Sequence, residues 1–110
     1  MSISLITEFP SFTKKAGKIF DKEELNELRE FLKSNPEKGD VIPGTSGLRK
    51  MRWSAGGKGK RGGARVIYFY HVVGFHIYLM ACYTKNEQSD LRPEVRKQLK
   101  AIIEQIKKGV

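Results

Sequence analysis

The residues best suited to chemistry lie between positions 55 and 64, where a glycine-rich loop carries several cations. Five of these ten residues are glycine, which permits close backbone approach to a ligand and exposes amide donors. The cations of the loop, with one that opens the next segment, are Lys58, Lys60, Arg61 and Arg65. No G-x-x-x-x-G-K-[ST] string occurs, so the loop is not a P-loop. It is either a solvated hairpin loop or a phosphate-binding loop, and we favour RNA phosphate contact.

A second pair of cations precedes this loop in "LRKMRWS", residues 48–54. Alternation along a strand puts Lys50 and Arg52 on one face and Met51 and Trp53 on the other. Cations on a sheet surface, together with Arg65 on the next strand, can grip a phosphodiester and stabilise negative charge in a transition state. The alternative is an outer sheet face whose charges are only solvated.

Aromatic and imidazole groups gather on the two β-rich runs that follow the loop. The tyrosines are Tyr68, Tyr70, Tyr78 and Tyr83. Exposed tyrosines stack on unpaired bases, but core packing is the more frequent role for each of them. His71 and His76 flank the turn between the runs, far from the cationic loop, which argues against an acid–base pair.

Charge and composition narrow the class of partner. The net charge is +9, and residues 41–86 contain eight Lys or Arg and no acid. A field of one sign attracts nucleic acid first, an acidic protein second and an anionic membrane third.

The single cysteine and the lack of targeting signals indicate the compartment. Cys82 lies in an apolar run and is expected to be a buried thiol, and neither a secretory leader nor a membrane-spanning stretch is evident. We therefore expect one cytoplasmic domain over residues 1–110.

Hydrophobic periodicity, together with the positions of proline, glycine and capping residues, predicts the helices and strands that must position these groups. A strand is expected within residues 2–9, a short helix or turn at 11–20, and a helix at 21–35 whose capping box joins Asp21 and Glu24. A strand at 48–54 and a hairpin around Gly74 follow, and Pro93 begins the last helix. The fold class is α+β: a small antiparallel sheet, mixed through the N-terminal strand, with helices packed on one face.

Residues 39–106 resemble a known family. The segments "GLRKMR", "GKGKRGGARVIY" and "YTKNEQSDL", in this order and spacing, are similar to the RelE/HigB toxins of bacterial type II toxin–antitoxin systems, and most to their phage-derived, HigB-like branch. The resemblance extends from about Pro36 to the C-terminus, whereas residues 1–35 match only in the order of elements.

The resemblance implies a RelE-like fold and a ribosome-dependent mRNA endonuclease. Such toxins cut mRNA in the A site of the 30S subunit, and the RNA's own 2′-hydroxyl is the nucleophile. They use no metal or other cofactor, and they do not act at a membrane. A cognate HigA- or RelB-like antitoxin silences the toxin, and their complex binds operator DNA. By position, the resemblance implies Arg52, Arg65 and Lys85 as catalytic residues.

Other residues follow from the same comparison as RNA contacts or proton carriers. RNA-binding residues are expected at Lys50, Lys58, Lys60, Arg61, Tyr70, Asn86 and Arg92. Asn86 stands where some members of the family have a second arginine. Arg92 stands where the family has a tyrosine that can act as a general base. Glu87, Asp90 or Tyr70 remain candidates for acid–base work.

Two other functions remain open at this point. The first is a non-catalytic module that binds RNA or the ribosome. The second is a domain whose basic face docks an acidic, antitoxin-like protein.

Overall fold

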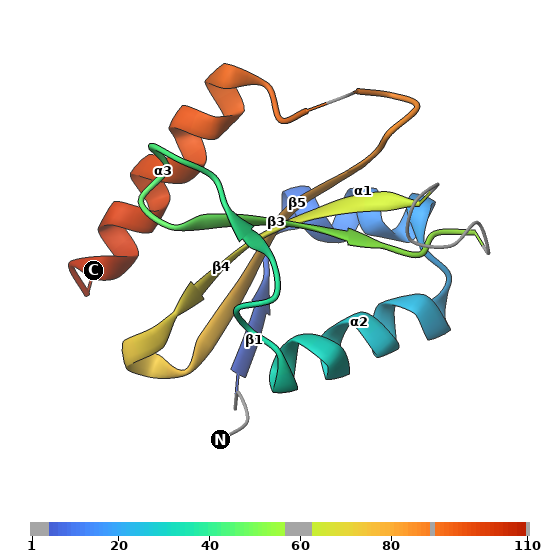
Figure 1. The fold of residues 1–110 in the computed structure, drawn as a ribbon, viewed down its shortest axis with the longest axis horizontal. Helices are drawn as coiled ribbons and strands as arrows, with labels where there is room; N and C mark the ends of the chain where they lie inside the picture. Colours follow the sequence, from blue (N-terminus) through green and yellow to red (C-terminus); the bar gives the residue numbers. More distant parts are fainter. Residues whose placement is uncertain (1–4, 57–62, 89, 110) are drawn as a thin grey trace.

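The computed structural model describes residues 5–56, 63–88 and 90–109. Its centre is a five-stranded sheet, which Figure 1 shows with helices around it. The elements are β1 (Leu5–Glu8), α1 (Pro10–Ile19), α2 (Lys22–Ser34), β2 (Asp40–Val41), β3 (Leu48–Trp53), β4 (Ala64–His71), a short 3₁₀ helix (Val72–Gly74), β5 (His76–Thr84) and α3 (Pro93–Lys107). Strand order is β1-β5-β4-β3-β2. Only the β1–β5 pair is parallel, so the predicted mixed sheet is confirmed.

Helices cover both faces of this sheet. Helices α1 and α2 pack on one face, where Phe12 and Leu28 join a core that includes Val66. Helix α3 packs on the other, where Leu99 and Ile103 join a second core. The α+β class holds, but the prediction that the helices share one face is wrong. Strand β4 places apolar side chains on both faces of the sheet, so both faces must be shielded from water by helices.

Local signals explain where the helices begin. Asp21 accepts from the backbone N–H of Glu24, whose carboxylate accepts from the N–H of Asp21, so the predicted capping box is confirmed. Helices α1 and α3 each begin at a proline, Pro10 and Pro93, whose missing N–H is no loss in the first turn.

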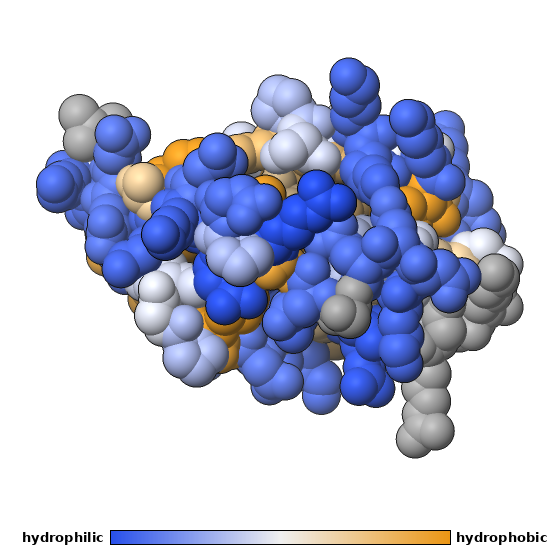
Figure 2. Space-filling model, turned by 90° about the horizontal axis from the view of Figure 1, so that it is seen from above, coloured by the Kyte–Doolittle hydropathy of each residue, from blue (hydrophilic) through white to orange (hydrophobic). Residues whose placement is uncertain are grey.

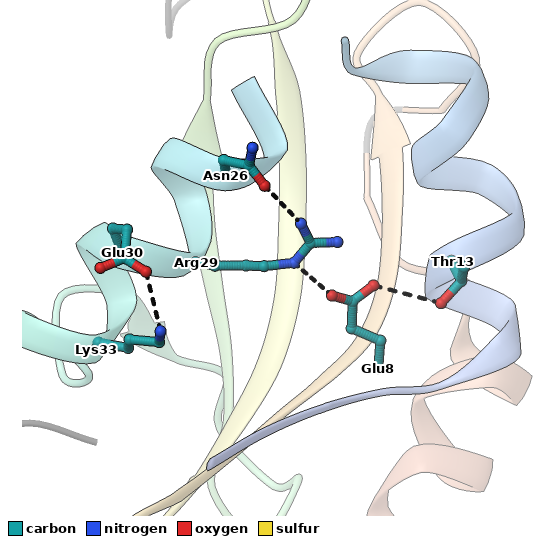
Figure 3. Close-up of polar contacts among 6 residues, drawn as sticks. All are labelled: Glu8, Thr13, Asn26, Arg29, Glu30 and Lys33. Atoms are coloured by element: carbon teal, nitrogen blue, oxygen red, sulfur yellow. Dashed lines mark hydrogen bonds and ion pairs between the residues drawn. The ribbon is translucent and has the colours of Figure 1, made fainter. Parts of the chain in front are cut away.

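A polar cluster ties β1 to both helices on its face (Figure 3). The Glu8 carboxylate accepts from Arg29 Nε at 2.6 Å and from Thr13 Oγ1 at 3.5 Å. Arg29 also donates to Asn26 of its own helix at 3.1 Å. The short parallel strand is thus attached to α1 and α2 by side chains as well as by its ladder.

A β-bulge interrupts the β4–β5 ladder. Ile67 pairs with Ala81, but the next residue, Tyr68, pairs with Leu79, so Met80 is the extra residue. Both Met80 and Ala81 then lie on the α3 side of the sheet. Side chains before and after the bulge therefore alternate in opposite phase along β5.

Tyr68 fastens the segment before β2 to the core. Its buried hydroxyl accepts from the Gly39 N–H and donates to the Pro36 carbonyl, both at 2.8 Å.

Tyr68→Phe leaves the buried Gly39 N–H without an acceptor, so we expect a loss of about 1–3 kcal/mol in the free energy of unfolding. Denaturant titration measures it. Tyr78→Phe, on the other face, is the control, and equal stability of the two variants would contradict the prediction.

Within the described residues, no helix combines the length and apolar character that crossing a bilayer requires.

Candidate anion-binding active site

Three side chains form a row across the sheet at the end of β4 that adjoins the glycine-rich loop. Arg52 of β3 pairs with Arg65 of β4, which in turn pairs with Tyr83 of β5. Residues directly opposite on neighbouring strands share a face, so all three belong to the α3 side. Like charges opposite one another destabilise a sheet, and an anion bound between Arg52 and Arg65 would relieve this cost.

Polar atoms without partners gather at this row. Among the described residues, the buried side-chain N and O atoms lacking a hydrogen bond are Arg65 Nη1, Tyr83 Oη and Arg96 Nε. Tyr83 is only 3% exposed, yet its hydroxyl contacts no acceptor or donor. Buried polar groups are normally satisfied, so three such atoms around this row make it a candidate ligand site.

An acidic residue connects the row to α3. The Asp90 carboxylate lies 3.4 Å from Lys50 Nζ and 3.5 Å from Arg96 Nη2. Lys50 is opposite Ile67 and two residues from Arg52, so it extends the cationic face along β3. Figure 2 looks from above, onto the end of the molecule where the loop between β5 and α3 runs, and this surface is mostly hydrophilic.

Two groups at this site have shifted pKa values. Burial raises the pKa of the Tyr83 phenol above its ordinary value, and the Asp90 charge adds to this, whereas Arg65 and Arg96 oppose it. The phenol is therefore protonated at neutral pH and acts as a donor. A hydrogen bond from the Leu91 N–H, helped by the charges of Lys50 and Arg96, lowers the pKa of Asp90, which stays ionised.

The two predicted residues that directly follow β5 line a hollow that includes none of the three residues of the row. Lys85 and Asn86 line a hollow of about 190 Å³ together with Lys18 of α1. Glu87 forms an ion pair with Lys15 of α1, and its pKa is lowered first by the hydrogen bond from Lys15. Among the described residues, no hydrogen bond or ion pair joins Lys85 or Glu87 to Arg65.

The remaining predicted residues are distributed as follows. Tyr70 packs against the α1–α2 core and so lies on the opposite face from Arg65. Arg92 is the exposed N-cap of α3 and lines a hollow with Tyr83 and Glu87. The predictions for Lys58, Lys60 and Arg61 fall outside the described residues.

The Cys82 thiol and the His76 imidazole do not belong to this row. Cys82 is buried, and burial raises its pKa to about 12, so the thiolate is not formed at neutral pH. His76 donates to or accepts from Thr7 Oγ1 at 2.6 Å, at the far end of β4 and β5. Over the described ranges, no group of three or more His, Cys, Asp or Glu could hold a metal ion.

Two members of the site were not assigned to it from the sequence. The sequence predicts base stacking or core packing for Tyr83 and predicts no functional role for Arg96. Strict alternation from Ile77 and Leu79 would put Tyr83 on the α1–α2 face, but the bulge at Met80 reverses the phase. The only sequence signal for Arg96 is its place in the first turns of a helix that follows the cationic strands.

The role of Asp90 can be tested by removing its charge. In Asp90→Asn, Lys50 and Arg96 lose their internal counter-charge, so single-stranded RNA should bind about threefold more tightly at 0.15 M salt, roughly the weight of one phosphate contact. Fluorescence anisotropy at several salt concentrations measures this, with Glu27→Gln on the exposed surface of α2 as the control. Unchanged affinity together with lost RNA cleavage would instead make Asp90 an acid–base group.

Comparisons with known proteins agree with the expected fold. No family model matches the sequence. Among solved structures, a free-state mutant of the E. coli toxin RelE, with two arginines replaced by alanine, is similar to this chain with a TM-score of 0.58 and 11% identity. The match covers 81% of this chain and 90% of that one. At such low identity the likeness shows the fold alone, which is RelE-like, while the HigB-like branch stays a prediction.

Proposed function

We propose that this protein is a metal-independent endoribonuclease that cleaves mRNA in the ribosomal A site, the activity of a toxin that an antitoxin holds silent. The observation that carries the proposal is the row Arg52–Arg65–Tyr83, with two cations opposite one another and a buried phenol that has no partner. A RelE-like fold is consistent with it.

The row suits cleavage of RNA by its own 2′-hydroxyl. In that reaction the 2′-hydroxyl gives its proton to water as its oxygen bonds to phosphorus, the bond from phosphorus to the 5′-oxygen breaks, and a 2′,3′-cyclic phosphate is left. Negative charge builds on the non-bridging oxygens, and Arg52 and Arg65 would neutralise it from two strands. The planar guanidinium group presents a fork of N–H donors that fits phosphate oxygens.

Proton transfer needs a donor at the leaving 5′-oxygen. The Tyr83 phenol fits this role, because its raised pKa keeps it protonated and no acceptor among the described residues competes for its proton. Lys50, held 3.4 Å from Asp90, can release that carboxylate and take a phosphate oxygen instead. Lys85 and Asn86, in their hollow beside Lys18, would contact RNA that flanks the scissile phosphate.

The test is cleavage on translating ribosomes. We expect purified protein, added to an extract translating a defined mRNA, to yield a downstream fragment with a 5′-hydroxyl, because the 5′-oxygen leaves with a proton. A 5′-phosphate would indicate attack by water and overturn the mechanism. Growth arrest upon expression, relieved by the product of a neighbouring reading frame, tests the toxin–antitoxin relationship and any operator binding by the complex.

A non-catalytic RNA-binding module is the alternative. It is favoured by the ion pairs of the two nearby carboxylates, since Glu87 binds Lys15 and Asp90 binds Lys50, which leaves no free carboxylate base beside Arg65 among the described residues. Intact mRNA on ribosomes that the protein nonetheless occupies would establish this alternative.

A further inference from the structure

A basic groove runs along the first half of α3, beyond the row of the candidate site. It measures about 330 Å³ and lies between the helix and the turn that precedes β3, where the chain runs close to α3 (Figure 1). Its lining residues are Pro43, Gly44, Pro93, Arg96, Lys97 and Lys100. Three of the six are cations and none is acidic.

The charges of this groove are poorly compensated. Arg96 and Lys100 are four residues apart on the helix, and Lys97 and Lys100 are three apart, so the side chains are neighbours that repel one another. In the described part of the chain, Lys97 and Lys100 take part in no ion pair and no hydrogen bond. Such repulsion is tolerated most easily where an anionic ligand offsets it.

The groove is continuous with the candidate site through Arg96. Its Nη2 lies 3.5 Å from Asp90, whose other carboxylate oxygen is 3.4 Å from Lys50. The charge of Arg96 also acts on the hydroxyl of Tyr83, in the row itself. A polymer bound at the row can therefore pass Arg96 and reach Lys100 without leaving the cationic surface.

We propose that this groove binds the sugar–phosphate backbone of the substrate RNA on one side of the scissile phosphate, with Lys97 and Lys100 as phosphate contacts. The inference rests on the proposed function, since it assumes that RNA is what lies across the row. An acidic protein segment is the competing occupant. RNA is favoured because its regular charges match a line of cations that begins at the phosphate-binding row.

The test compares binding rather than cleavage. A single-stranded RNA with a 2′-deoxy group at the cleavage position cannot be cut, so its affinity can be measured on the intact chain. In Lys97→Ala combined with Lys100→Ala, we expect about tenfold weaker binding at 0.15 M salt, and a slope of log K against log salt that falls by about 1.4, because each phosphate contact contributes about 0.7 for single strands. Alanine favours helix at least as well as lysine, so α3 is retained.

The matched control removes two exposed cations from the other face, in Lys14→Ala combined with Lys22→Ala. Its salt slope should stay close to that of the wild type. An equal loss of RNA affinity in both double variants, or an unchanged salt slope in the variant that lacks Lys97 and Lys100, would overturn the proposal that this groove binds RNA. Weaker binding of polyglutamate with unchanged RNA binding would assign the groove to an acidic protein.

Cleavage on ribosomes separates this inference from the proposed function. If the wild type never cuts mRNA but the groove variant still loses RNA affinity, the endonuclease proposal fails and the groove stands. If the wild type cuts mRNA and the groove variant binds RNA normally, only the groove fails.

Discussion

Replacing Arg65 by alanine should reduce mRNA cleavage on ribosomes by about 10²–10³-fold, the usual cost of losing one preorganised donor to a developing negative charge. Arg65 is the centre of the row, opposite Arg52 on one side and Tyr83 on the other. Among the described residues, one of its guanidinium nitrogens is buried without a hydrogen-bond partner, so this donor is available to a ligand. The loss should appear in the rate at saturating ribosome concentration.

The conservative variant sharpens this test. Arg65→Lys keeps the charge but loses the planar fork of donors, so we expect only partial recovery of the rate. Unfolding of the alanine variant should change little or even require more denaturant, since two opposed cations become one. Cleavage at the wild-type rate in a folded Arg65→Ala protein would remove Arg65 from the mechanism, and a matching loss in Lys14→Ala would show that general charge is responsible.

Replacing Tyr83 by phenylalanine should slow cleavage by about 10²-fold or more, the usual contribution of a positioned proton donor. The ring, buried among residues packed by α3, is retained in this variant. Only a hydroxyl that has no partner is removed, so the free energy of unfolding should be unchanged or slightly higher. A residue with a purely structural role would show the opposite combination, which is lower stability and normal cleavage.

The pH profile gives Tyr83 a second readout. Burial raises its pKa above the ordinary value of about 10, so the phenol remains a donor as pH rises from 7 to 9. Wild-type activity should therefore not decline through loss of this proton in that range. Tyr83→Phe should be slower by a constant factor over the same range, and a factor that changes with pH would assign proton transfer to another group. Tyr70→Phe, on the opposite face, is the matched control.

Local patterns in the sequence determined most of the elements and much of their polarity. Asp21 and Glu24 have the spacing of a capping box, and Pro93 suits the first turn of a helix, so both helix starts were predicted correctly. Alternation in β3 correctly separated Met51 and Trp53, which are buried, from Lys50 and Arg52.

The sequence predicted Arg52 and Arg65 on neighbouring strands, but not that the two residues stand directly opposite one another. Arg52 and Arg65 are thirteen positions apart, and their facing depends on the register that the loop between them permits. Tyr83 depends on the bulge at Met80, which reverses the alternation that Ile77 and Leu79 begin.

The sequence by itself therefore determined where the positive charge is concentrated, which segments form helices and strands, and which strand residues can face a ligand. Tertiary structure alone decided that α3 covers the face opposite α1 and α2, that Tyr83 rather than Tyr70 joins the arginines, and that Lys85 lies with Lys18 instead. The reason is physical: helix caps and strand periods depend on neighbours in sequence, whereas register, bulges and layer order are set by packing between segments that are distant in the chain.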